Sequence, residues 1–270
     1  MKNRTIAVTT NCYHGYSVEE AIAGIQAAGF KYVELTAMKG WVEHVFPDHS
    51  FEQLLRVKDL MDEAGLTAIG MSGHVSLMDP DKLDDFVKNI RLARFFDIPC
   101  IVTFVGEPAD SSIEVTTEAI VARIGAVLPY LEKYDMVMAL EVAGKQSSGM
   151  SLVEIVKQVN SPRVTIAYDT ANAIFYGDVD TMADLGGCLQ QVGYIHIKEK
   201  AAGRQEWSFP ALGQGYVPFS EVFAMVDEAE NASPYVVEIE FTPQGAGSLE
   251  AVNQAVLDSA NYLKAQGFVL

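Results

Sequence analysis

Eight short apolar runs rich in Val, Ile and Tyr alternate with amphipathic stretches along the chain, and this alternation is the strongest constraint on its fold. Each interval between runs is long enough for one strand, one helix and two loops. Eight such units make a (β/α)8 barrel, which takes about 250 residues, close to the 270 available. We therefore predict an α/β fold, a single TIM-barrel domain over residues 1–270. The predicted strands are residues 5–10, 32–36, 67–72, 100–104, 136–142, 164–169, 194–198 and 235–241.

The amphipathic stretches carry their own start and stop signals. Ser17 and Ser50 are each followed three residues later by Glu or Gln, which is the capping-box pattern of a helix start. Gly29 and Gly65 lie where the same two helices need a residue with left-handed backbone to end. The least regular stretch is 199–215, a long connection after the seventh predicted strand, and loops of that length are often functional.

An open, doubly wound sheet would show the same alternation, so the position of the polar residues decides between the two folds. A barrel collects its chemistry at the C-terminal ends of several strands. Polar or charged side chains follow one predicted strand after another, which favours the closed barrel. These side chains are His14, Glu34, His74, Glu107, Glu141, Asp169, His196 and Glu240.

Composition and charge exclude several classes of protein. Hydrophobic residues make up 49% and charged residues 20%, which is typical of globular chains and argues against disorder or a fibrous repeat. The formal net charge of −17 disfavours binding to nucleic acid. The 3 cysteines are far apart, so neither a disulfide framework nor a zinc ribbon is expected. With no signal-like or membrane-spanning run, we expect a cytoplasmic protein that does not bind membranes.

Four of the polar residues form a candidate metal site, namely Glu141, Asp169, His196 and Glu240. Each lies inside or at the end of an apolar strand, where an unpaired carboxylate must be protonated, paired or bound to a metal. Three carboxylates and one imidazole at one barrel mouth are most simply satisfied by a shared divalent cation. Oxygen-rich ligation with a single nitrogen suits Mn²⁺, Mg²⁺ or Co²⁺, and Zn²⁺ is also compatible.

The last predicted strand offers two carboxylates, Glu238 and Glu240, which point to the same face at different depths because the side-chain period of a strand is two. Glu240 is nearer the C-terminal mouth and is therefore the expected ligand, although the two assignments can be exchanged. The same period places Lys198 beside His196 on the inward face. Lys198 could neutralise a substrate oxyanion there, or simply pair with Glu238.

Two further residues are candidates for contact with a substrate. His74 directly follows the third predicted strand and could hydrogen-bond a polyol, although a structural role is equally compatible with its position. Trp41 lies in the second strand-to-helix connection, where its ring could close over a ligand or serve only in packing.

Four short motifs lie at three of the candidate metal ligands and in the long connection 199–215. They are Tyr168-Asp169-Thr-Ala-Asn172, His196-Ile-Lys198-Glu, Leu212-Gly-Gln-Gly and Glu240-Phe-Thr-Pro243. Together with 17–22 and 28–35, they resemble the xylose isomerase-like TIM-barrel family of sugar isomerases and epimerases, and the resemblance covers nearly the whole chain.

The resemblance implies roles for individual residues. Glu141, Asp169, His196 and Glu240 match the family's four metal ligands, and the first and last glutamates would also move protons. Arg204 stands where ketose 3-epimerases have an arginine that holds substrate oxygens. Asn172 replaces a histidine of many members; an amide can hydrogen-bond a substrate hydroxyl, but it cannot titrate.

The predicted activity is that of a divalent-metal-dependent isomerase or epimerase of a sugar or keto-sugar, with Mn²⁺ as the favoured metal. Proton transfer would pass through a metal-bound enediolate, with Glu141 and Glu240 as acid and base. The same residues are compatible with a dehydratase or lyase acting on a keto-polyol or keto-glycoside, or with a non-catalytic sugar-binding protein. An abasic-site endonuclease is disfavoured by the net charge and by only 5 histidines. The sequence leaves a homo-oligomer open, and few basic residues end the strands, which favours an unphosphorylated substrate.

Overall fold

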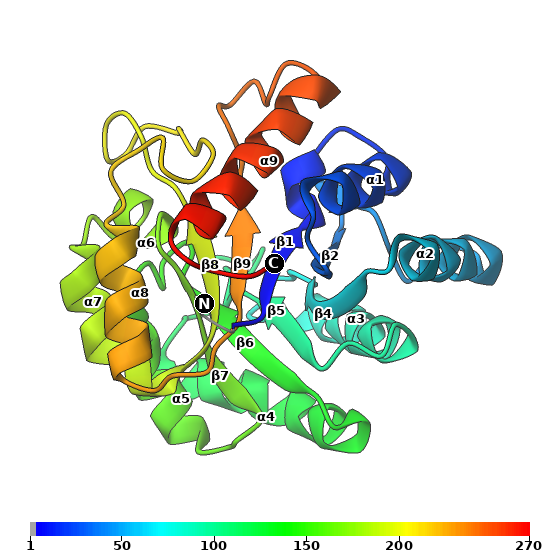
Figure 1. Cartoon of the computed structure of the whole chain (residues 1–270). Helices are drawn as coiled ribbons and strands as arrows, with labels where there is room; N and C mark the ends of the chain where they lie inside the picture. The colour runs from blue at the N-terminus through cyan, green and yellow to red at the C-terminus, as the bar shows by residue number, and fades with distance from the viewer. Residues whose placement is uncertain (1–3) are drawn as a thin grey trace.

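Eight parallel strands close into a barrel in the computed structural model of the chain, which describes residues 4–270 (Figure 1). β1 pairs with β2 on one side and with β9 on the other, and these two pairings close the ring. The barrel confirms the predicted (β/α)8 fold. Its strands are β1 (Ile6–Thr9), β2 (Tyr32–Met38), β4 (Thr67–Ser72), β5 (Cys100–Thr103), β6 (Val137–Glu141), β7 (Val164–Asp169), β8 (Val192–Lys198) and β9 (Tyr235–Glu238).

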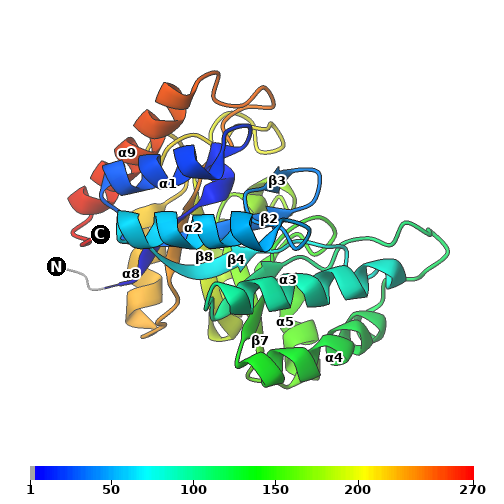
Figure 2. The same ribbon diagram turned by 90° about the vertical axis from the view of Figure 1, so that its right-hand side faces the viewer.

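Helices cover the outside of the barrel, and Figure 2 shows α1 and α2 side by side on one flank. The helices are α1 (Val18–Ala28), α2 (Phe51–Ala64), α3 (Leu83–Phe95), α4 (Thr117–Tyr134), α5 (Gly149–Val159), α6 (Asn172–Phe175), α7 (Thr181–Cys188), α8 (Phe219–Glu228) and α9 (Leu249–Ala265). Short 3-10 turns are η1 (Thr10–Tyr13), η2 (Pro80–Lys82) and η3 (Leu189–Gln191).

The predicted helix signals of α1 and α2 are confirmed. Ser17 and Ser50 form complete capping boxes, in which each hydroxyl accepts a backbone N–H and the third helical residue bonds back to the cap. Gly29 and Gly65 adopt left-handed backbone with φ of 91° and 66°, which ends the helices without the steric cost of a side chain.

Two local features differ from the sequence prediction. A short strand, β3 (Val42–Glu43), runs antiparallel to the end of β2, and the turn between them carries Trp41. β9 ends at Glu238, three residues earlier than predicted, and Phe241 lies at φ 58°. The reason is a cross-link between two loops, because the backbones of Phe209 and Phe241 exchange hydrogen bonds of 2.8 and 2.9 Å. After Glu238 the chain therefore leaves the pairing with β8 and pairs with Phe209, while the Glu240 carboxylate stays against Lys198.

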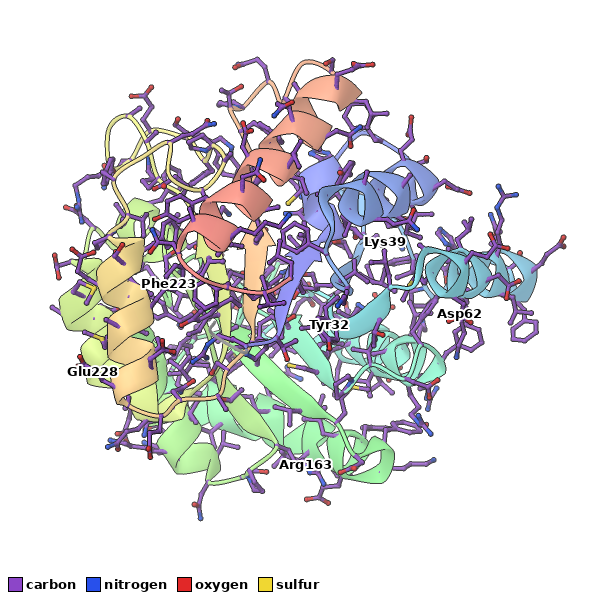
Figure 3. All side chains as sticks on the ribbon, in the orientation of Figure 1. Tyr32, Lys39, Asp62, Arg163, Phe223 and Glu228 are labelled. Carbon is purple, nitrogen blue, oxygen red and sulfur yellow. The ribbon has the colours of Figure 1, made fainter. Side chains whose placement is uncertain are left out.

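The apolar core has two parts, one between barrel and helices and one inside the barrel. Figure 3 shows Asp62 and Glu228 on the outer helices and Phe223 on α8, whose buried ring packs 5.0 Å from that of Tyr235 on β9. Inside the barrel, small residues surround Tyr194, and the backbone of Gly70 on β4 lies against its hydroxyl. Within residues 4–270, no helix is long and apolar enough to span a membrane.

Candidate metal centre

Four buried side chains meet at the C-terminal ends of neighbouring strands. Glu141 ends β6, Asp169 ends β7, His196 lies in β8 and Glu238 ends β9. One potential ligand atom from each lies within 4.8 Å of those of the other three. The strand register explains this convergence, because Asp169 is paired with His196 and the next inward residue of β8, Lys198, is paired with Glu238. We refer to these four residues as the acidic cluster.

The acidic cluster contains three of the four ligands expected from the sequence, and its fourth member is Glu238 in place of Glu240. Because β9 ends at Glu238, that carboxylate keeps its inward direction, whereas Glu240 lies in the segment that leaves the sheet. Glu240 Oε2 is 2.5 Å from the ammonium of Lys198. Asn11 joins the two carboxylates, since its Nδ2 donates to Glu238 Oε1 at 2.7 Å and to Glu240 Oε1 at 3.3 Å.

The imidazole of His196 is held between carboxylates on both of its edges. Its Nδ1 lies 2.6 Å from Glu141 Oε1 and 3.5 Å from Glu238 Oε2. Its Nε2 lies 3.1 Å from Oε2 of Glu34, a wholly buried residue of β2 that also accepts a 2.8 Å hydrogen bond from Ser72. Glu34 therefore orients the ring so that Nδ1 faces the acidic cluster.

The contact between Glu34 and His196 shifts the pKa values of the two groups in opposite directions. Burial tends to raise the pKa of Glu34, but His196 outweighs it and the net pKa is lowered. Burial tends to lower the pKa of His196, and the charges of Glu34 and Glu238 more than reverse this, so its pKa lies well above the ordinary value. The surrounding carboxylates thus favour the charged form of His196.

The donor set of the acidic cluster fits a divalent cation. Asp169 Oδ1 accepts two backbone hydrogen bonds of 2.8 Å, from Ala171 and Asn172. Among the described residues, no donor hydrogen-bonds to Asp169 Oδ2 or to Glu238 Oε2, although both atoms are buried. Burial raises the pKa of Asp169 well above its ordinary value. Each oxygen has longer ion-pair contacts instead, since Lys198 Nζ lies 3.8 Å from Asp169 Oδ2 and 3.7 Å from Glu238 Oε2. Buried carboxylate oxygens that accept no hydrogen bond are costly unless nearby cations compensate them, and hard divalent cations prefer such ligands.

Three of the expected substrate-binding residues lie at the acidic cluster. His74 Nε2 is 3.5 Å from Glu141 Oε2, and its ring stacks on Phe104. The buried Lys198 ammonium donates to Asn172 Oδ1 at 3.3 Å and lies 3.8 Å from Asp169 Oδ2. Burial opposes the charge of Lys198, but the charges of Glu238 and Glu240 raise its pKa well above the ordinary value.

The other two expected residues lie elsewhere. The indole N–H of Trp41 donates to Asn11 Oδ1 at 2.9 Å, and its ring lies at 34° to that of His14 with centroids 4.1 Å apart. In the described hydrogen bonds, Asn11 therefore links Trp41 to the carboxylates. The guanidinium of Arg204 is exposed and bonds to Asp178 and to the carbonyl of Val179. Its described bonds therefore tie the loop after β8 to the turn after α6.

Glu34 was expected only as one of the polar side chains that follow the strands, and neither Asn11 nor Trp207 was singled out from the sequence. Glu34 carried a usable signal, because a carboxylate inside the apolar run 32–36 must find a buried partner. Asn11 carried none, and the signal for Trp207 was only its place in the long connection 199–215, because the position of each depends on how a loop folds over the barrel mouth. The ring of Trp207 packs edge-on against Phe175 at 5.6 Å and Phe209 at 5.1 Å.

Comparisons with known proteins agree with this architecture. Residues 22–266 match the family described as xylose isomerase-like TIM barrel. The structure of a D-allulose 3-epimerase from Methylomonas sp. is similar with a TM-score of 0.73 and 18% identity, covering 98% of this chain and 99% of that one. A D-psicose 3-epimerase from Clostridium cellulolyticum H10, crystallised with D-tagatose, has a TM-score of 0.75 and 15% identity, with 97% and 98% coverage.

A xylose isomerase domain protein from Planctomyces limnophilus has a TM-score of 0.74 and 19% identity, covering 97% of this chain and 96% of that one. No curated protein sequence matches the chain significantly. At these identities the structural likeness establishes the fold, and the chemistry has to be argued from the residues of the site.

Proposed function

The chain belongs to the xylose isomerase-like TIM-barrel family, and from this premise we propose that it is a divalent-metal-dependent isomerase or epimerase of a sugar or keto-sugar. The observation that carries the proposal is the acidic cluster, with its buried oxygens that accept no described hydrogen bond. The 3-epimerases among the structural neighbours, which include one crystallised in complex with D-allulose, support a small sugar as substrate.

We assign Glu141, Asp169, His196 and Glu238 as the residues that would hold the metal ion, which exchanges the sequence-based roles of Glu238 and Glu240. A bound divalent ion would act as a Lewis acid that polarises a substrate carbonyl and acidifies the neighbouring C–H bond. Mn²⁺ is the proposed ion, and Mg²⁺, Co²⁺ and Zn²⁺ suit the same donors.

Glu141 and Glu240 are the proposed proton carriers. Glu240 is outside the acidic cluster, where its carboxylate contacts Lys198 and Asn11. Burial raises its pKa even though Lys198 acts in the opposite direction. A carboxylate with a raised pKa is a stronger base, and a pKa closer to the operating pH suits a group that must both take up and release a proton. Epimerisation follows if the two glutamates serve opposite faces of one carbon, and isomerisation follows if the proton returns to the adjacent carbon.

The remaining polar groups would orient the substrate. The Lys198 ammonium can stabilise a developing oxyanion beside Glu240, which lies 2.5 Å away. His74 can donate to a substrate hydroxyl next to Glu141, and the Asn172 amide can do the same next to Lys198. The ring of Phe104 stacks on His74 and would give this side of the site an apolar wall.

Incubation of the Mn²⁺-loaded protein with ketoses, keto-inositols and keto-glycosides in D2O, followed by NMR, tests the proposal. We expect deuterium at a carbon next to the carbonyl, and its loss in both Glu141→Gln and Glu240→Gln. Glu228→Gln, an exposed change on α8, is the control and should exchange normally. Exchange that survives both site substitutions would overturn the assignment.

The same spectra separate the alternatives. A dehydratase or lyase would release water or a leaving group and give a new unsaturated carbonyl product. A non-catalytic sugar-binding protein would show sugar binding by calorimetry with no exchange in any compound, and that result would overturn the proposed function.

A further inference from the structure

A cavity of about 540 Å³ opens beside the acidic cluster and shares only Glu240 with the proposed proton carriers. Its floor is formed by residues that follow β1, such as Asn11 and Cys12, and by the segment 239–246 after β9. Glu141, Asp169, His196 and Glu238 do not line it. The cavity therefore extends away from the metal ligands, starting at the carboxylate that we propose moves a proton.

Trp41 and Trp207, the only 2 tryptophans of the chain, both line this cavity. Trp41 comes from the turn after β2, which neighbours β1, and Trp207 comes from the loop after β8, which neighbours β9. The two indoles thus flank the ends of β1 and β9 from opposite sides. Trp41 is 42% exposed although it is one of the largest apolar side chains, which suits a face that a ligand covers.

The cavity is linked to the reacting end of the site by one residue. Asn11 Oδ1 accepts from the indole of Trp41, and Asn11 Nδ2 donates to Glu238 and Glu240. A ligand that settles on Trp41 is therefore positioned relative to both carboxylates.

The loop that carries Trp207 is held by two buried, oppositely charged neighbours. The Lys200 ammonium donates to the carbonyls of Ala201, Gly203 and Glu206 at 2.5 to 2.8 Å. Glu199 accepts from the backbone N–H of Gly213 at 2.9 Å and of Val217 at 3.0 Å. Hydrogen bonds thus hold the loop on both sides of Trp207, so its ring lines the cavity before a ligand binds.

The charge of the lining indicates what the cavity takes. Of the described residues that line it, none is Lys or Arg, and Glu240 is the only carboxylate. Apart from the imidazole of His14, a phosphate or carboxylate group on the ligand would find no basic side chain among these lining residues. The apolar faces of indole rings suit the C–H faces of an uncharged sugar ring, and a volume within about 300–1,000 Å³ is that of a pocket for a ligand of several rings.

We propose that this cavity is a subsite for an uncharged second sugar ring, so that the substrate class is a keto-glycoside rather than a free monosaccharide. This inference rests on the proposed function, since it takes Glu240 as the boundary between the reacting sugar and its substituent. The second ring lies between Trp41 and Trp207, and the keto-sugar reaches the acidic cluster past Glu240.

Calorimetric titration of the Mg²⁺-loaded full chain with D-fructose and with isomaltulose, a glucosyl-fructose disaccharide, tests the proposal. We expect isomaltulose to bind about tenfold more tightly than fructose, and its binding to change tryptophan fluorescence because both indoles line the cavity. Trp207→Ala should remove most of that advantage and leave the Kd of fructose within about twofold. Trp207→Phe, which keeps an aromatic face, should retain part of it.

Gln244→Trp fills the cavity from its exposed rim and provides a second test that leaves Trp207 intact. It should weaken isomaltulose binding about tenfold without affecting fructose. Phe51→Ala, which removes an exposed ring on α2, is the control and should alter neither Kd.

Equal affinity for the two sugars, or equal losses for both in Trp207→Ala and Gln244→Trp, would overturn the subsite. Deuterium exchange tests the proposed function separately. Tight isomaltulose binding without deuterium exchange would overturn the enzyme assignment and leave the subsite standing. Deuterium exchange into fructose, with isomaltulose bound no more tightly than fructose, would support the enzyme and overturn the subsite.

Discussion

Nε2 of His196 lies 3.1 Å from Oε2 of Glu34, so a carboxylate from the middle of β2 holds the imidazole from inside the barrel. The opposite ring nitrogen faces Glu141 and Glu238. Glu34 thus acts on the acidic cluster through His196, by fixing the tautomer and the direction of the ring.

Glu34→Gln should weaken metal binding by about 10- to 100-fold, because the amide no longer fixes the Nε2–H tautomer of His196. The measurement is calorimetric titration of the metal-free protein with Mn²⁺. Glu63→Gln, at an exposed position of α2, provides the matched control with the same change of charge. An unchanged Kd in Glu34→Gln would show that the His196–Glu34 contact is only structural.

Stability should depend on pH through the same pair. The lowered pKa of Glu34 gives a stabilisation that is present above about pH 4.5 and lost as the pH falls through its folded value. The raised pKa of His196 gives a second stabilisation, which is fully present below about pH 6.5 and is lost as the pH rises through the folded-state pKa of the imidazole. Both stabilisations are therefore present together between about pH 4.5 and pH 6.5.

Urea unfolding of the metal-free protein should therefore show the largest difference in free energy between the original chain and Glu34→Gln at pH values of about 4.5 to 6.5. The difference should shrink on further acidification. A difference that stays constant down to about pH 3 would contradict a charged pair.

Glu238→Gln and Glu240→Gln should separate metal binding from proton transfer. Glu238 belongs to the acidic cluster, so its substitution should lower the bound metal content after dialysis, whereas Glu240→Gln should keep the metal and lose deuterium exchange. Elemental analysis and NMR of the same samples measure both quantities. The reverse pattern would restore Glu240 as the ligand.

The sequence alone does not decide whether Glu238 or Glu240 joins the acidic cluster. The period of two correctly places Glu238 and Glu240 on one face, and the Val and Ile content locates β9. Which of the two joins the acidic cluster depends on where the strand ends, and beyond Glu238 the chain pairs with Phe209 through Phe241. A contact between two loops that are distant in sequence leaves no periodic signal.

The positions of the strands, in contrast, could be predicted from the sequence. Buried parallel strands need continuous apolar runs, and the predictions for β4 and β7 match the observed bounds. The cavity could not be predicted, because Trp41 and Trp207 come together only after the turn before β3 and the loop after β8 fold over the barrel.

Gly70→Ala should destabilise the fold by about 1–3 kcal/mol. A methyl group at Gly70 would collide with the hydroxyl of Tyr194, and both residues lie inside the barrel, where neighbours cannot move aside easily. Gly125→Ala on α4 is the matched control. No neighbouring heavy atom lies within 4 Å of its added methyl, so it should stabilise the helix by about 0.5–1 kcal/mol. Urea denaturation measures both changes, and equal effects would contradict the packing argument.

Glu199→Ala should loosen the loop that carries Trp207. The buried carboxylate accepts backbone N–H groups of Gly213 and Val217, and its loss leaves them without that acceptor. Amide hydrogen exchange at these two residues should become at least tenfold faster, corresponding to about 1.4 kcal/mol of local stability, while amides of α4 keep their rates. Unchanged protection at Gly213 and Val217 would show that other contacts anchor the loop.

The closure of the barrel between β1 and β9 sets the order in which a newly made chain can complete its site. β1 is synthesised first, yet one of its edges has no partner until Tyr235–Glu238 has left the ribosome. Asn11 then meets Glu238 across a separation of 227 residues. The three residues of the acidic cluster on β6 to β8 are therefore synthesised before Glu238, and the cluster can be completed only after translation has passed the last strand.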